Sequence, residues 1–125
     1  MDKNKILIVE ESYAIQLLTK KILEFNNWDI TLAESAELAL KTLEEQHFDI
    51  ILMDINLPGI NGMECMLLIR KLSDKIKANI PIIAVTGNSM DLTLEEYIER
   101  GFTYFLQKPA KFEVLLERIG IILNK

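Results

Sequence analysis

Two apolar runs in this chain stop at acidic residues. Residues 5–9 are a lysine followed by Ile, Leu, Ile and Val, and they lead directly into Glu10 and Glu11. Residues 49–53 are an aspartate followed by four apolar residues, and they lead into Asp54. Short runs of β-favouring apolar residues indicate buried strands, so each acidic residue should stand where a strand ends. If the two strands are neighbours, three carboxylates crowd one point, which requires a cation, a shared proton or a chemical task.

Five such runs alternate with segments of helical period. The expected strands are residues 5–9, 30–33, 49–53, 80–85 and 103–106, and the expected helices are residues 12–26, 35–46, 62–72, 92–100 and 111–123. The first, third and fourth strands show little alternation of apolar and polar residues, which is typical of strands covered on both faces. Regular alternation of strand and helix therefore predicts an α/β fold, with helices on both sides of one parallel sheet.

Composition restricts the functions that are open to the chain. Its 125 residues predict one domain, and a net charge of −5 argues against binding to nucleic acid through phosphate contacts. No apolar stretch approaches the roughly 20 residues needed to span a membrane. Cys65 is the only cysteine, so no internal disulfide can form, and we expect a cytoplasmic protein. The predicted elements run through almost the whole of residues 1–125, which predicts a single domain with no effector domain attached.

Polar side chains gather where the predicted strands end. In an open α/β sheet, ligand sites lie beyond the carboxyl ends of the strands. Glu10, Glu11 and Asp54 supply oxygen ligands of the kind that Mg²⁺ prefers. Thr86 and Lys108 supply a hydroxyl and an ammonium, which can stabilise a phosphoryl group. Asp54 lies between the acidic pair and these donors, so we predict that it is a nucleophile that accepts a phosphoryl group.

Four segments of the chain resemble the receiver domain of two-component response regulators. They occur in the family's order and with similar spacing, at residues 6–11, 51–62, 81–87 and 108–109. The resemblance implies a flavodoxin-like, doubly wound sheet of five strands in the order 2-1-3-4-5. It implies a phosphorelay protein rather than an enzyme, and because no effector domain is predicted, we expect a stand-alone receiver. A histidine kinase or a histidine phosphotransfer protein would be its phosphodonor, and Asp54 would be the phosphoacceptor.

The same resemblance implies roles for the residues around Asp54. Thr86 and Lys108 would contact the phosphoryl oxygens, and the Lys108–Pro109 peptide bond would be cis. Phe105 would be a switch residue coupled to the Thr86 hydroxyl, although a plain core position remains the alternative. Asn88 matches a position that tunes loss of the phosphoryl group, with an ordinary loop asparagine as an equally open alternative. Mg²⁺, for which Mn²⁺ could substitute, would be held by Glu10, Glu11, Asp54 and the backbone carbonyl of Asn56.

Glu11 departs from the pattern of the family, in which this position is nearly always Asp and contacts Mg²⁺ directly. The extra methylene displaces its carboxylate by roughly 1.5 Å, one carbon–carbon bond, whereas Mg²⁺ demands near-ideal octahedral geometry. Two hypotheses follow. Either Mg²⁺ still binds and Asp54 is phosphorylated, or metal binding is poor and the domain is a pseudo-receiver that serves for docking.

Two surfaces are candidates for protein contacts. The helix predicted at residues 12–26 has apolar side chains over roughly 240° of its circumference, which is more than one sheet face requires. Either the helix is generously buried, or its surplus docks on the kinase, with Ala14, Ile15 and Leu18 as the contact residues. For output to a downstream protein, the resemblance implies the face formed by residues 92–100, 103–106 and 111–123, with Tyr97, Tyr104 and Phe112 as candidates.

Other functions fit the sequence less well. A phosphatase of the haloacid-dehalogenase type needs a second aspartate two residues after its nucleophile, and Asn56 stands there. A flavin-binding protein needs a phosphate-binding loop after the first strand, where Glu10 and Glu11 would repel phosphate. His47 and Cys65 lie away from the strand ends, and we interpret both as structural.

Overall fold

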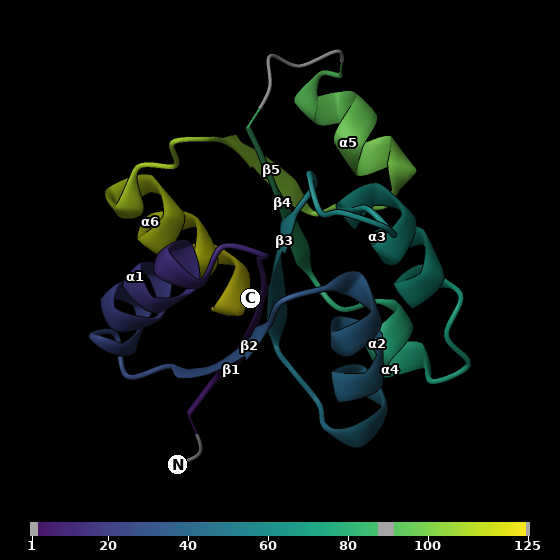
Figure 1. Cartoon of the computed structure of the whole chain (residues 1–125), viewed down its shortest axis with the longest axis horizontal. Helices are drawn as coiled ribbons and strands as arrows, with labels where there is room; N and C mark the ends of the chain where they lie inside the picture. Colours follow the sequence, from purple (N-terminus) through teal and green to yellow (C-terminus); the bar gives the residue numbers. More distant parts are fainter. Residues whose placement is uncertain (1–2, 88–91, 125) are drawn as a thin grey trace.

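Five parallel strands form one sheet in the order β2-β1-β3-β4-β5 (Figure 1). The computed structural model describes residues 3–87 and 92–124. The predicted fold class and strand order are confirmed. The strands are β1 (Lys5–Val9), β2 (Asp29–Ala33), β3 (Ile50–Asp54), β4 (Ile82–Thr86) and β5 (Tyr104–Gln107).

Helices cover both faces of the sheet. Figure 1 shows α1 and α6 on one face, and α2, α3 and α5 on the other. Within residues 3–87 and 92–124, no helix is long and apolar enough to cross a membrane. The helices are α1 (Tyr13–Glu24), α2 (Ala36–Glu45), α3 (Gly62–Arg70), α4 (Lys75–Ala78), α5 (Leu94–Arg100) and α6 (Phe112–Leu123).

The central strands are buried on both faces, as their composition predicts. Alternate residues of β1 enter different cores: Ile6 and Ile8 pack on the side of α1 and α6, whereas Leu7 and Val9 pack on the side of α2 and α3. All four side chains are buried. Burial on both faces fixes the register of β1 between β2 and β3, because a slip of one residue would exchange the two cores.

Two predicted boundaries were wrong in a way that matters for the site. The expected strands ended at Met53 and Val85, but the ladders continue one residue further. Asp54 is paired with Val85, and Thr86 is paired with Gln107. Both polar residues are therefore the last residues inside their strands, where the backbone holds them rigidly.

The sequence did not predict α4, because a helix of four residues is too short to show a period. Asp74 is its N-cap, and its carboxylate accepts hydrogen bonds from the backbone N–H groups of Ile76 and Lys77. These bonds satisfy two of the amide groups that the start of a helix leaves without partners.

Arg70, the last residue of α3, joins three neighbouring segments of the chain by hydrogen bonds. Its guanidinium donates hydrogen bonds to the carbonyl oxygens of Ala78 (3.0 Å), Ile80 (2.7 Å) and Gly101 (2.9 Å). Those carbonyls belong to the last residue of α4, the segment just before β4 and the C-cap of α5. Partial burial lowers the pKa of the Arg70 guanidinium, which nevertheless stays charged at neutral pH.

We therefore predict that Arg70→Met lowers the free energy of unfolding by about 2–3 kcal/mol, because hydrogen bonds from a charged donor are lost and three carbonyls lose their partner. Urea unfolding measures the change. Arg100→Met is the matched control, since Arg100 is exposed and should change stability by less than about 0.5 kcal/mol. Equal effects of the two substitutions would contradict this account.

Candidate functional site

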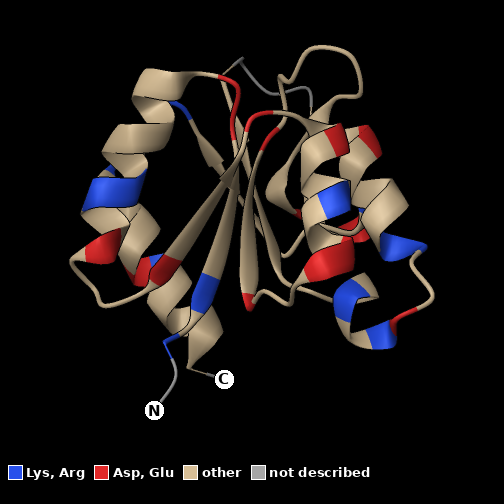
Figure 2. Cartoon of the chain, turned by 60° about the horizontal axis from the view of Figure 1, so that its bottom comes forward, with Lys and Arg blue, Asp and Glu red and all other residues tan. Residues whose placement is uncertain are grey.

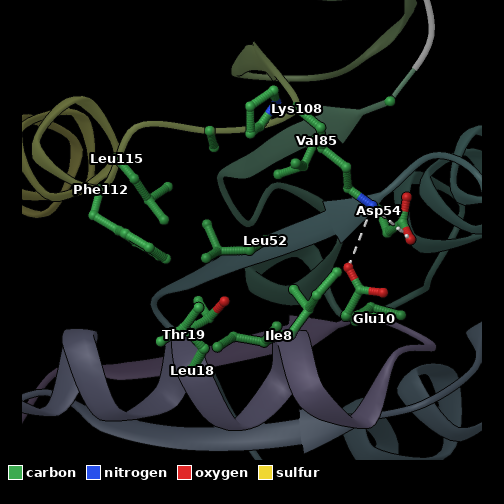
Figure 3. A pocket seen from close by; sticks show the side chains of 15 residues that line it. Ile8, Glu10, Leu18, Thr19, Leu52, Asp54, Val85, Lys108, Phe112 and Leu115 are labelled. Atoms are coloured by element: carbon green, nitrogen blue, oxygen red, sulfur yellow. Dashed lines mark hydrogen bonds and ion pairs between the residues drawn. The ribbon is translucent and has the colours of Figure 1, made fainter.

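Three residues far apart in the sequence meet at the carboxyl end of the sheet. The ammonium nitrogen of Lys108 lies 3.4 Å from Oε1 of Glu10 and 3.3 Å from Oδ2 of Asp54 (Figure 3). Glu10 is 7% exposed and Asp54 is 5% exposed, so the two carboxylates share one cation in a largely buried place. Figure 2 shows acidic segments at this edge, where the central strands end.

Glu10 is held by its own backbone and by the start of α1. Its N–H donates to the carbonyl of Ala33 (3.0 Å), the last residue of β2. Its Oε2 accepts from the backbone N–H of Ser12 (2.9 Å), and its carbonyl accepts from the buried side-chain amide of Gln16. This leaves Oε1 directed at Lys108. The carboxylate is thus oriented before any ligand arrives.

Asp54 is positioned by the loop between β3 and α3. Its Oδ1 accepts from the backbone N–H of Asn56 (2.9 Å), and Oδ1 of Asn56 accepts from the N–H of Gly87 (3.1 Å). The loop returns so closely that Gly62 donates its N–H to the carbonyl of Ile55 (3.1 Å). A Cβ on Gly62 would overlap the carbonyl oxygen of Asp54. Only glycine allows α3 to begin this close to the acidic residue.

Thr86 lies at the end of β4, the strand beside β3, and Phe105 lies on β5, the next strand in the sheet. Thr86 is 1% exposed, and its carbonyl accepts a hydrogen bond from the N–H of Lys108 (2.6 Å). The Lys108–Pro109 peptide bond is cis, as the resemblance implied. Phe105 is partly buried, and its ring stacks on that of Tyr97, with 4.8 Å between centroids. Phe105 therefore connects β5 to α5.

Two expectations about this region were wrong. Three carboxylates were expected to crowd together, but among the described residues no group of three or more acidic, histidine or cysteine side chains could hold a metal ion. Glu11 is exposed, because the chain turns away from the sheet after Glu10. Tyr97 was expected on an exposed output face, but it is 2% exposed and packs between Phe102 and Phe105. The helix α5 is too short for its pattern of apolar residues to show which side faces the core.

The candidate docking residues lie on the open side of α1. Ile15 is 43% exposed and Leu18 is 52% exposed, and Ala14 is exposed as well. The apolar surplus of this helix is therefore on the surface. Of the other output candidates, Tyr104 is partly buried beneath the guanidinium of Arg118, 4.0 Å from the ring centroid, and Phe112, the first residue of α6, is partly buried.

The remaining candidates lie away from the site. His47 pairs with Asp74 at 3.9 Å, near the far end of the sheet. Cys65 is fully buried in α3; burial, aided by the negative charge of Glu37, raises the pKa of its thiol to about 12, so it stays protonated. Both are structural in this fold. Asn88 lies outside the described residues.

Comparison with known proteins identifies the family. Residues 6–120 match the family described as "Response regulator receiver domain", so the chain belongs to it. CAI-1 autoinducer sensor kinase/phosphatase CqsS of Vibrio cholerae is 35% identical over 118 residues, which cover 94% of this chain and 17% of that protein. Transcriptional regulatory protein AfsQ1 of Streptomyces coelicolor is 32% identical over 120 residues, which cover 96% of this chain and 51% of that protein. The chain thus spans about half or less of these relatives.

Solved structures agree with this assignment. A CheY-like receiver domain from Methanospirillum hungatei is 32% identical with a TM-score of 0.83, and the match covers 98% of this chain and 95% of that one. Chemotaxis protein CheY4 of Vibrio cholerae is 26% identical with a TM-score of 0.87, and the match covers 98% and 100% of the two chains. The protein is therefore a receiver domain of two-component signalling, a class that works mainly as a phosphoacceptor switch.

Receiver domains generally bind Mg²⁺ at their acidic site, and the donor set here fits such an ion. Glu10 and Asp54 already share a cation, the ammonium of Lys108. Two carboxylates suffice, because Mg²⁺ in proteins usually takes one or two of them and completes its shell with water and phosphate oxygens. The exposed Glu11 is outside this pair.

Substitution of Gly62, the first residue of α3, tests whether the close approach of α3 holds the backbone of Asp54 in place. We predict that Gly62→Ala lowers the free energy of unfolding by about 1–3 kcal/mol, because the new methyl group displaces the backbone of Asp54. Gly120→Ala is the control: nothing lies within 4 Å of its new Cβ, so it should raise stability by about 0.5–1 kcal/mol through helix propensity. Urea unfolding measures both. Stabilisation by both substitutions would show that the approach of α3 is not tight.

Proposed function

We propose that Asp54 accepts a phosphoryl group from a phosphohistidine on a histidine kinase or a histidine phosphotransfer protein. The observation that carries the proposal is the buried carboxylate of Asp54 at the end of β3, with the Lys108 ammonium 3.3 Å away and Glu10 on the other side of that ammonium. Membership of the receiver family supports it. An enzyme with a separate substrate has no comparable support.

The transfer is a substitution at phosphorus. An oxygen of Asp54 forms a bond to phosphorus as the bond to the histidine nitrogen breaks, and the imidazole leaves with that electron pair. The product is an acyl phosphate on Asp54. The Lys108 ammonium would then bind a phosphoryl oxygen in place of the carboxylate. The buried Thr86 hydroxyl would donate a hydrogen bond to a second phosphoryl oxygen. Both side chains are already beside the acceptor, so little reorganisation is needed.

Mg²⁺, when bound, would supply positive charge that neutralises the phosphoryl oxygens. Glu10, Asp54 and the backbone carbonyl of Asn56 would hold it, and Glu11 would reach it through water rather than directly, because its side chain is exposed. Mn²⁺, which prefers similar oxygen ligands, could replace it. The competing hypothesis is a pseudo-receiver with weak metal binding, and it depends on the same Glu11.

Phosphorylation would be read out through Thr86 and Phe105. When the Thr86 hydroxyl turns to the phosphoryl group, the space beside it changes, and the ring of Phe105 can follow. Because that ring stacks on Tyr97, the change would reach α5 and the face formed by α5, β5 and α6, where a downstream protein would bind. An organisation without an attached effector domain, and a cytoplasmic location, stay predictions.

The direct test is phosphorylation by acetyl phosphate in the presence of Mg²⁺. Intact-mass spectrometry should show one added phosphoryl group in the wild-type chain, and none in Asp54→Asn. Lys108→Met should reduce the rate by at least about a hundredfold, comparable to the loss of one charged transition-state donor. Phosphorylation of the Asp54→Asn variant at a similar rate would exclude Asp54 as the acceptor.

Glu11→Asp separates the active receiver from the pseudo-receiver. The shorter side chain restores the usual family residue, so it should tighten Mg²⁺ binding by about tenfold, the effect of one charge-assisted contact. Trp28 fluorescence or amide NMR can follow a Mg²⁺ titration. Saturable binding by the wild-type chain at millimolar Mg²⁺ supports the active receiver. If only Glu11→Asp binds, the wild-type chain is a pseudo-receiver.

Leu18→Asp tests the docking surface on α1. We expect it to slow phosphotransfer from the cognate kinase by at least about tenfold, because a charge replaces an apolar contact in the interface. Phosphorylation by acetyl phosphate should be unchanged, since no protein docks in that reaction. Leu38→Asp is the matched control, because Leu38 is an exposed leucine on α2. Equal loss with both donors would mean that Leu18 acts on the fold.

A further inference from the structure

A cleft of about 600 Å³ lies between α1 and α6 and ends at the acidic site (Figure 3). This volume is within the range of small-molecule pockets. Phosphoryl transfer at Asp54 would use only the charged end of this cleft, whereas the candidate kinase contacts Ile15 and Leu18 line part of its length. Its long walls come from α1, from the central strands and from α6, and the side chains that line them include Ile8, Leu18, Thr19, Leu52, Phe112 and Leu115.

The cleft is strongly asymmetric. Its length is lined almost entirely by aliphatic and aromatic side chains, whereas its charged groups, Glu10, Asp54 and Lys108, stand together at one end (Figure 3). Apolar walls with a few convergent polar groups are the usual composition of a site that binds and orients one small molecule. The ligand should therefore have an apolar body and one polar head.

The charges at this end favour a cationic head. Among the described residues, two carboxylates face one ammonium, so this group of three carries one net negative charge. The ammonium of Lys108 lies 3.3 and 3.4 Å from the two carboxylate oxygens, which is longer than the roughly 2.7–2.9 Å of a strong charge-assisted hydrogen bond. A second ammonium could bind these oxygens at shorter distances. Without a metal ion at the site, an anionic head would meet both carboxylates and be repelled.

Within residues 3–87 and 92–124, the apolar end of the cleft is open to solvent. Ile15 and Leu18 line it, yet they are 43% and 52% exposed. A ligand body seated between α1 and α6 would remove this surface from water, which is favourable in proportion to the apolar area covered. Phe112, which is partly buried on the opposite wall, offers an aromatic ring for the same body to pack against.

From these features we propose that the cleft binds a small organic amine. Its aromatic or branched-alkyl body lies between α1 and α6, and its protonated amino group binds Glu10 and Asp54. The inference goes beyond the proposed function, because binding requires neither phosphorylation nor Mg²⁺. The amino group would occupy the place of the metal and the phosphoryl group, so the bound amine would hold the receiver unphosphorylated.

The test uses phenylbutylamine as the probe, without Mg²⁺ or phosphodonor. Methyl NMR should show saturable shifts at Leu18, Leu52 and Leu115, which line the cleft. Phenylbutanol, which lacks the charge, and butylamine, which lacks the ring, should each bind at least about tenfold more weakly, since each loses one of the two contacts. Equal binding of the alcohol would overturn the cationic head, and unshifted cleft methyls would overturn the site.

Two matched pairs of variants locate the probe. Glu10→Gln should weaken binding at least about tenfold, whereas Glu11→Gln, the same change on an exposed neighbour, should leave it within about twofold. Ala110→Leu places extra carbons in the cleft and should block the probe, whereas Val114→Leu adds a methylene on the exposed side of α6 and should not. Unchanged binding by Ala110→Leu would overturn the proposal even if Glu10→Gln fails to fold.

Mg²⁺ provides a further check on the same samples. Because the amine and the metal would share Glu10 and Asp54, adding Mg²⁺ should raise the apparent dissociation constant of phenylbutylamine in proportion to its concentration. Binding that ignores saturating Mg²⁺ would overturn the shared site. If Asp54 is never phosphorylated but the probe still binds as described, the proposed function fails while this inference stands.

Discussion

The ammonium of Lys108, held between Glu10 and Asp54, is the interaction on which the site depends. Two largely buried carboxylates at adjacent strand ends would repel each other without a cation. Lys108 supplies that cation from the end of β5, and its backbone N–H bonds to the carbonyl of Thr86 at the end of β4. One residue thus joins the acidic and hydroxyl halves of the site. A metal ion or an organic amine would act by sharing or taking over its role.

The parallel sheet makes this meeting possible. Strands β1, β3 and β4 are adjacent and point the same way, so their last residues reach one edge although they are far apart in the sequence. The two apolar cores on either side keep the register. At that edge Gly62 lets α3 begin against Asp54, and the hydrogen bonds of Asn56 join the loop to Gly87. The same contacts therefore stabilise the fold and orient the Asp54 carboxylate.

The parts of the site that lie at strand ends were predictable, because a local sequence pattern marks where each strand ends. Apolar runs ending in Glu10 and Asp54 predicted strand ends, and the order of strands brought these ends together. The exposure of Glu11 was not predictable, because it depends on how the chain leaves β1. Neither the bridging of three carbonyls by Arg70 nor the burial of Tyr97 is visible in a local pattern, since both depend on contacts between distant elements. The cleft between α1 and α6 likewise arises only from their packing.

A double-mutant cycle between Lys108 and Asp54 tests the central claim most directly. The free energy of unfolding is measured in urea at neutral pH for the wild-type chain, Lys108→Met, Asp54→Asn and the double variant. A partly buried charge pair predicts a favourable coupling energy of about 1–3 kcal/mol. Additive effects, with a coupling below about 0.5 kcal/mol, would show that the ammonium does not hold the Asp54 carboxylate and would contradict the account of the site.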